Sequence, residues 1–288
     1  MTSRKRNSVL LALVLLITGS TLTTDRQANG FFHTGYATYA WGQNYVGQLG
    51  IGNTTNQTVP VQVGTANNWQ AISAGRLHSL GIKTNGTLRA WGNNDSGQLG
   101  IGNTTDQTAP VQVGTRLWQA ISAGDEHSLG IRADGTLRAW GGNDSGQLGI
   151  GNTTDQTAPV QVGTRLWQAI SAGGQHSLGI RTDGTLRAWG NNDSGQLGIG
   201  NTTDQTAPVQ VGTRLWQAIS SGGQHSLGIR ANGTLRAWGY NDSGQLGIGN
   251  TTDQSAPVQV GASTYWSAID AGNAYSLGFR PAAIIPPV

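Results

Sequence analysis

The chain contains one 26-residue stretch, GQLGIGNTTDQTAPVQVGTRLWQAIS, three times without a change, starting at Gly97, Gly146 and Gly195. Trp-Gly pairs mark five copies of a wider unit; spaced 50, 49, 49 and 49 residues apart, they begin at Trp41, Trp91, Trp140, Trp189 and Trp238. Repetition at such a period indicates an architecture in which each unit buries its apolar surface against its neighbours. The repeat therefore limits the fold to a solenoid or a propeller.

The residue pattern inside each unit is that of short strands. Val160 and Val162 flank Gln161, which is the two-residue alternation of a half-buried strand. Short turns such as Ala133-Asp134-Gly135 suit hairpins, because glycine tolerates positive φ. All ten tryptophans occupy two positions of the unit, and we expect them in the core. Four antiparallel strands per unit predict an all-β fold, a β-propeller of about five four-stranded blades.

The two ends of the repeat region carry complementary fragments. Residues 37–42, ATYAWG, match the last strand of a unit, TLRAWG, and the fifth unit stops at Pro281, where that strand would begin. We expect the N-terminal strand to pair with the C-terminal blade and close the ring, which leaves no free edge. Residues 30–280 are thus predicted to form a single propeller, and residues 281–288 a C-terminal tail.

The first segment, residues 1–24, has the order of a secretory signal peptide and a short spacer. Three basic residues, Arg4, Lys5 and Arg6, precede an apolar run from Val9 to Ile17. An uncleaved anchor is the alternative, but nine apolar residues fall short of the roughly 20 that span a bilayer. We expect export to the periplasm, cell surface or exterior, with no membrane span after cleavage.

The charge balance changes once that segment is removed. The chain has 17 basic and 14 acidic residues, and loss of the three basic residues at positions 4–6 leaves 14 of each sign. A neutral body has no net attraction for nucleic acid or anionic membrane, so we expect no nucleic acid as partner. The chain also has no cysteine, which excludes disulfides and thiol chemistry.

The sequence WGNNDSGQLGIGN, with APVQVG, WQAISAGGQHSLGI and DGTLRAWG, resembles the repeat of the regulator of chromosome condensation family over about residues 37–280. The resemblance implies a propeller, commonly of seven blades, that recognises proteins through loops on one face. Members act in nucleotide exchange on a GTPase, in ultraviolet-B perception and in β-lactamase inhibition. The uniform spacing of the units leaves no room for the extra insertion of the exchange factors. No Trp precedes the repeated His, which argues against ultraviolet-B perception. The secreted β-lactamase inhibitors are therefore the nearest functional analogy.

Histidine and serine recur together at one position of the unit. Four units have a His followed by Ser at this position, and the fifth unit has Tyr275 in place of the His. The histidines are His78, His127, His176 and His225. A ring of metal-binding imidazoles is one interpretation; we favour the other, a hydrogen bond from each His within its own blade. Adjacent strand residues point to opposite faces, so His-Ser is no nucleophile–base pair. We expect no enzyme activity, no metal and no cofactor.

The copies differ mainly in the pair of residues before His and in the residue two after the Trp of each Trp-Gly pair. If these positions lie on loop rims, identical blades display different side chains, and we interpret the result as a protein-binding surface. The candidate contacts are Tyr45, Arg76, Leu77, Asp125, Glu126, Gln175, Gln224, Tyr240 and Asn273. Recent duplication followed by drift is the neutral alternative. A hydrolase, lyase or carbohydrate-binding propeller acting at the central channel, or an exchange-factor-like regulator, is the functional alternative.

Overall fold

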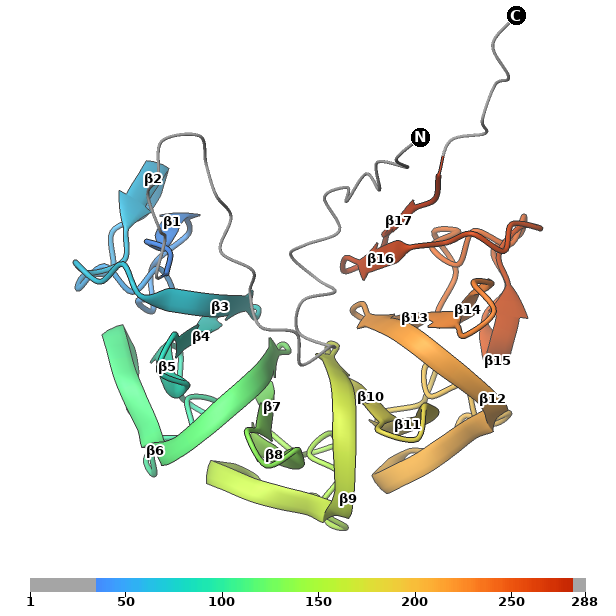
Figure 1. The fold of residues 1–288 in the computed structure, drawn as a ribbon, viewed down its shortest axis with the longest axis horizontal. Coiled ribbons are helices and arrows are strands. Elements are labelled where there is room, and N and C mark those ends of the chain that lie inside the picture. Colours follow the sequence, from blue (N-terminus) through green and yellow to red (C-terminus); the bar gives the residue numbers. More distant parts are fainter. Residues whose placement is uncertain (1–34, 282–288) are drawn as a thin grey trace, which may run out of the picture.

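The protein is described by a computed structural model over residues 35–281. The predicted signal peptide at residues 1–24 and residues 282–288 of the predicted tail lie outside the described residues. Regular structure between residues 35 and 281 is entirely β, in 17 strands. In this part of the chain, no helix has the length and hydrophobicity needed to cross a bilayer. Figure 1 shows the strands arranged as blades along an open arc.

The strands follow one another along the chain with these bounds: β1 (Tyr39–Gly42), β2 (Gln57–Gln62), β3 (Trp69–Ala74), β4 (His78–Lys83), β5 (Thr87–Gly92), β6 (Gln107–Ala123), β7 (His127–Arg132), β8 (Thr136–Gly141), β9 (Gln156–Ala172), β10 (His176–Arg181), β11 (Thr185–Gly190), β12 (Gln205–Ser221), β13 (His225–Arg230), β14 (Leu235–Gly239), β15 (Gln254–Gln259), β16 (Ala268–Ala271) and β17 (Ser276–Phe279).

Each long strand, β6, β9 and β12, belongs to two blades. The first part of β6 pairs with β5, as Arg89 opposite Gln112, and its second part pairs with β7, as Ile121 opposite Gly130. Between the two parts, Gly114 adopts a positive φ of 58°, which favours glycine. The sequence pattern predicts two separate strands here; the structure joins them into one strand that connects neighbouring blades.

Four blades are complete, each with four antiparallel strands. They consist of β3, β4, β5 and the start of β6; the end of β6, β7, β8 and the start of β9; the end of β9, β10, β11 and the start of β12; and the end of β12, β13, β14 and β15. The hairpin turns predicted from Gly86, Gly135, Gly184 and Gly233 are confirmed, with φ between 77° and 81°. The all-β propeller class is confirmed.

The predicted closure of the ring is wrong. Strand β1 pairs with β2, whereas β17 pairs with β16, and these two pairs form separate two-stranded sheets. Figure 1 shows β1 and β2 at one end of the arc and β16 and β17 at the other. The arc formed by the described residues stays open because each end pair hydrogen-bonds as a separate two-stranded sheet and is not joined to the other.

The hydrophobic core lies between blades. One cluster combines Leu80, Ile82 and Leu88 of the first complete blade with Trp118 and Trp140 of the second. The same arrangement recurs at the next two interfaces. The two tryptophans of each complete blade meet edge to face, with ring centroids 5.5–5.7 Å apart. Each blade thus buries its apolar faces against its neighbours, as the repeat predicts.

Candidate functional site

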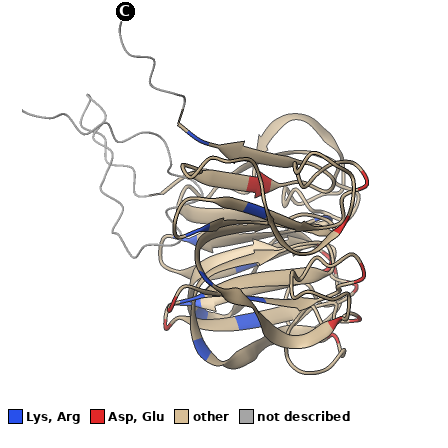
Figure 2. Ribbon diagram, turned by 90° about the vertical axis from the view of Figure 1, so that its right-hand side faces the viewer, with Lys and Arg blue, Asp and Glu red and all other residues tan. Residues whose placement is uncertain are grey.

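The connections between strands divide the molecule into two faces. We call the first the loop face: it carries the turns that precede β4, β7, β10 and β13 and the loops that follow β5, β8, β11 and β14. The opposite hairpin face carries the turns at Gly86, Gly135, Gly184 and Gly233. Figure 2 shows Asp and Glu mostly in loops on one side, and Lys and Arg on the other side and along the strands. The described residues have equal numbers of basic and acidic side chains, but the two signs are distributed differently between the two faces.

Six of the nine candidate contacts lie together in one depression on the loop face. The depression has a volume of about 210 Å³, and Gly174, Asn191, Gln196 and Gly223 complete its lining. The six are Arg76, Asp125, Glu126, Gln175, Gln224 and Asn273. They come from five successive units, so the arc gathers side chains that are up to about 200 residues apart in sequence.

Backbone hydrogen bonds join the turns that carry these residues. The amide of Arg76 donates to the carbonyl of Gly124 at 3.2 Å, that of Asp125 to Gly173 at 3.3 Å, and that of Gly223 to Asn273 at 3.2 Å. The variable side chains are therefore held on a connected row of turns rather than on independent loops.

Charge within the depression centres on Arg76, Asp125 and Glu126. Partial burial raises the pKa of the Asp125 carboxyl, and the positive charge of Arg76 offsets part of that rise. The Arg76 and Glu126 side chains are exposed, whereas Asp125 is half-buried. The depression therefore presents one cation, two carboxylates and several neutral amides to solvent, a combination suited to polar recognition.

The other three candidates lie outside the lining. The Tyr240 amide donates to the carbonyl of Gln224 at 2.9 Å, so Tyr240 borders the depression. Its hydroxyl donates to Asp242 at 2.8 Å, and this bond raises the pKa of the phenol. Tyr45 is exposed in the loop between β1 and β2, and half-buried Leu77 does not line the depression.

Besides Gly174 and Gly223, two residues that line the depression are absent from the sequence-based set. Asn191 occupies the variable position two after Trp189, so its position carries the same signal as Tyr240. Gln196 belongs to the GQLG stretch that is identical in every unit, and comparison of the copies cannot single it out. Its place in the depression follows from the fold alone.

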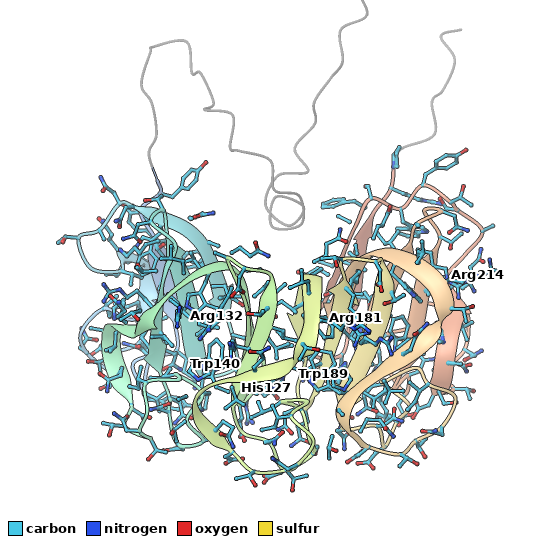
Figure 3. The ribbon with its side chains drawn as sticks, turned by 60° about the horizontal axis from the view of Figure 1, so that its bottom comes forward. His127, Arg132, Trp140, Arg181, Trp189 and Arg214 are labelled. Atoms are coloured by element: carbon cyan, nitrogen blue, oxygen red, sulfur yellow. The ribbon has the colours of Figure 1, made fainter. Side chains whose placement is uncertain are left out.

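The repeated histidines connect neighbouring blades, which corrects the prediction of a bond within each blade. The Nε2 atoms of His78, His127 and His176 lie 2.8–2.9 Å from the Oγ atoms of Ser128, Ser177 and Ser226 in the next blade. His225 makes the same contact with Ser276. Figure 3 shows His127 inside the molecule, between Trp140 and Trp189 in that view.

The proton of each imidazole can be assigned from the hydrogen-bond chain. The Ser177 hydroxyl donates its proton to the carbonyl of Gln147 at 2.8 Å, so it accepts from the Nε2–H of His127. The Nδ1 atom of His127 has no hydrogen-bond partner among the described residues. Burial lowers the pKa of His127 and of His176 to about 3, and that of His78 and of His225 to about 4. The histidines are therefore neutral donors.

These His–Ser pairs differ from a nucleophile with its base. A catalytic serine gives its proton to the imidazole, whereas Ser177 donates to a backbone carbonyl. Both His127 and Ser177 are fully buried, so a substrate has no access to them. Residues 35–281 also contain no group of three His, Asp or Glu side chains that could hold a metal ion.

The central channel is lined by the inner strands β3 and β16 and by the second parts of β6, β9 and β12. Its cavity has a volume of about 750 Å³, and Asp270 is the one ionisable residue in its lining. The serine hydroxyls there hold neighbouring blades together; the Oγ of Ser73 accepts from the amide of Ala123 at 3.0 Å, for example. A single carboxylate provides no acid–base pair.

Arginines on the hairpin face are packed against tryptophans. The Arg132 guanidinium lies 5.6 Å from the ring centroid of Trp118, and the Arg181 guanidinium lies 5.5 Å from that of Trp167. Burial, together with nearby Arg138 and Arg116, lowers the pKa of Arg132. Figure 3 shows Arg132 and Arg181 at equivalent places in neighbouring blades. Stacking on tryptophan gives these residues a structural role.

Comparison with solved structures supports the propeller class. The chain aligns with human WBSCR16 at 21% identity and a TM-score of 0.78, over 88% of this chain and 69% of that one. It aligns with Prp20p from Saccharomyces cerevisiae at 23% identity and a TM-score of 0.75, over 86% and 65%. The chain thus spans about two thirds of these related structures, and at such identities the likeness shows the fold alone. No curated protein sequence matches the chain.

Family models account for nearly all of the described residues. The regulator of chromosome condensation (RCC1) repeat matches five times, at residues 37–82, 85–131, 134–180, 183–229 and 232–278. A second model of the same repeat matches residues 69–98, 118–147, 167–196 and 216–245. Together with the blades and their buried Trp-Gly pairs, these matches show that the chain belongs to the RCC1 repeat family.

Proposed function

We propose that the chain is an exported, non-enzymatic propeller that binds another protein through its loop face. The observation that carries the proposal is the depression lined by Arg76, Asp125, Glu126, Gln175, Gln224 and Asn273. The side chains that differ between otherwise identical units meet there. A row of turns joined by backbone bonds presents them in a fixed order, which reduces the entropic cost of binding.

Two related structures support a protein as the partner. Prp20p is described together with its binding to Gsp1p and histones, and yeast RCC1 was solved bound to Kap60. The full burial of the His–Ser pairs and the lone carboxylate of the channel support binding rather than catalysis. The basic residues and apolar run at positions 4–17 support export.

The proposal is tested by comparing two sets of substitutions in pull-downs from the native envelope and secreted fractions. The loop-face variant combines Arg76→Ala, Asp125→Ser, Glu126→Ala and Tyr240→Ser. The control changes the hairpin face at Arg116→Ala, Arg165→Ala and Arg214→Ala. We expect the loop-face variant to lose the captured protein and the control to retain it, with thermal midpoints close to that of the parent chain. Equal capture by parent and loop-face variant would contradict the proposed surface.

A further inference from the structure

One position on the hairpin face holds an exposed apolar side chain in four successive units. Between residues 73 and 264, the exposed large hydrophobic residues are Leu117, Leu166 and Leu215, each 47–50% exposed. Each directly precedes the buried Trp of its unit. Tyr265 precedes Trp266 in the fifth unit and is 74% exposed. Exposure of apolar surface in this part of the chain is therefore concentrated at one repeated place.

Backbone hydrogen bonds hold each of these leucines between the turns of two neighbouring blades. The carbonyl of Leu117 accepts from the amide of Ala133 at 3.0 Å. The amide of the next residue, Trp118, donates to the carbonyl of Gly86 at 2.9 Å. The other two leucines are held by the equivalent pair of bonds. The three side chains therefore form a fixed row on the hairpin face, which we call the leucine row.

Basic side chains accompany the leucine row. An exposed arginine directly precedes each leucine; the three are Arg116, Arg165 and Arg214. A second basic residue ends the strand before each hairpin turn; the four are Lys83, Arg132, Arg181 and Arg230. Burial, and then the positive charges of Arg236 and Arg214, lower the pKa of Arg230. The guanidiniums of one blade are thus close enough to repel one another.

Few carboxylates balance this positive charge. Two of the hairpin turns contain Asp134 and Asp183, whereas the other acidic residues between residues 35 and 281 lie in loop-face connections or, as Asp270, in the channel. The Asp134 carboxylate accepts from the hydroxyl of Thr136 at 2.6 Å and from its amide at 3.0 Å. Within the described residues, the hairpin turns and the leucine row carry seven basic side chains against two acidic ones. Figure 2 shows this separation of the two signs.

This combination of charge and apolar surface matches the boundary of an anionic bilayer. Basic side chains are attracted to anionic headgroups, while apolar side chains on the same face enter the boundary between headgroups and acyl chains. A soluble polyanion would contact the arginines and leave the leucines in water. A protein surface would have to offer an apolar pocket at every repeat of the row, whereas a lipid surface is uniform along it.

We propose that the hairpin face docks on an anionic lipid surface. In the docked state, the leucine row enters the headgroup boundary, and Arg116, Arg165 and Arg214 contact lipid phosphates. This docking does not depend on the protein-binding loop face. Because the two faces lie on opposite sides of the disc, a docked chain presents the depression to the solution, where a partner can reach it.

The first test measures co-sedimentation of the full chain with vesicles. We expect binding to vesicles of phosphatidylcholine with phosphatidylglycerol, little binding to phosphatidylcholine alone, and weaker binding as salt is raised. The variant Arg116→Ala/Arg165→Ala/Arg214→Ala should lower the partition coefficient about 100-fold. The matched variant Arg116→Lys/Arg165→Lys/Arg214→Lys keeps the charge and should bind like the parent. Failure of the parent to bind anionic vesicles, or equal binding to both vesicle types, overturns the proposal.

The second test separates a bilayer from other anions. The variant Leu117→Ser/Leu166→Ser/Leu215→Ser should lower the partition coefficient about tenfold, with an unchanged circular dichroism spectrum, because the side chains are exposed in the free chain. If this variant binds like the parent while the Arg→Ala variant does not, the face binds anions without entering the bilayer, and the proposal is wrong.

Two controls assign the binding to the hairpin face. The variant Arg4→Ala/Lys5→Ala/Arg6→Ala, whose positions lie outside the described residues, should bind vesicles like the parent. Loss of binding in this variant would assign the interaction to the N-terminal segment and refute docking through the hairpin face. The loop-face variant of the pull-down should also bind vesicles like the parent, so the proposed function and this inference fail separately.

The third test locates the docked surface directly. The natural chain has no cysteine, so Leu166→Cys and Thr153→Cys can each be labelled with an environment-sensitive fluorophore. Both positions are exposed, and Thr153 lies in the loop-face connection after β8. On anionic vesicles, we expect a blue shift and protection from aqueous iodide at position 166 and neither at position 153. An equal response at the two positions, or none at position 166, contradicts the inference.

Discussion

The buried histidines predict that the fold loses stability in mild acid. Burial lowers the pKa values of four imidazoles from 6.5 to about 3 or 4. The unfolded chain therefore binds more protons than the folded one once the pH falls below the unfolded value of 6.5. Stability is complete above that pH and declines as the pH falls toward the folded pKa values.

The magnitude follows from the size of these shifts. A His with a folded pKa of about 4 contributes roughly 2 kcal/mol less to the free energy of unfolding at pH 5 than at pH 7. Four independent sites together give about 7 kcal/mol, which is comparable with the whole stability of many domains. Near pH 5.5, the free energy of unfolding should fall by about 5 kcal/mol per pH unit, which corresponds to uptake of nearly four protons.

The measurement is urea denaturation followed by tryptophan fluorescence at several values between about pH 7 and pH 5. The matched variant is His176→Gln, since a glutamine amide can donate to Ser226 but does not titrate. Whatever its effect at pH 7, this variant should reduce the slope of free energy against pH by about one quarter. A free energy of unfolding that does not change with pH, or equal slopes for variant and parent, would refute the assignment of buried neutral imidazoles.

Two further matched pairs test the packing between blades. Ser177→Ala removes the acceptor of the buried His127 Nε2–H, and we expect a cost of about 1–3 kcal/mol in urea denaturation; Ser79→Ala should cost less, because the Ser79 hydroxyl only donates to Gln48. Gly198→Ala and Gly200→Ala share a left-handed backbone, but the new Cβ meets Trp238 at 2.7 Å only at Gly198. Thermal denaturation should therefore show a larger loss for Gly198→Ala, by about 1–3 kcal/mol; equal losses would show that the left-handed backbone alone sets the cost.

Local structure could be predicted because it depends on residues close in sequence. Alternating Val and Gln residues mark strands, the Gly of each hairpin turn adopts positive φ, and Trp-Gly pairs supply the core of every complete blade. The closure of the ring could not be predicted in this way. It depends on contacts between blades, such as that of His127 with Ser177, 50 positions apart, which the pattern within one unit does not define.

The candidate site, too, could be predicted from the sequence only in part. Differences between copies identify Arg76, Asp125 and Gln224 as variable, and the turns that carry them lie on one face because every unit has the same connections. Tyr45 lies outside the depression, as do Asp95, Asp193 and Asp242 at the equivalent position of other units, so this position of the unit does not reach the depression. Gln196 lies inside it although its position does not vary.

The long strands β6, β9 and β12 have a consequence for how such a chain can change in length. The 49-residue sequence unit and the blade are out of phase, since each long strand starts in one blade and ends in the next. Unequal recombination between the identical stretches at Gly97, Gly146 and Gly195 would add or remove one unit while leaving every junction intact. Copy number is then a variable that duplication can alter in single steps, and each step changes how far the arc extends while the internal blades keep the same contacts.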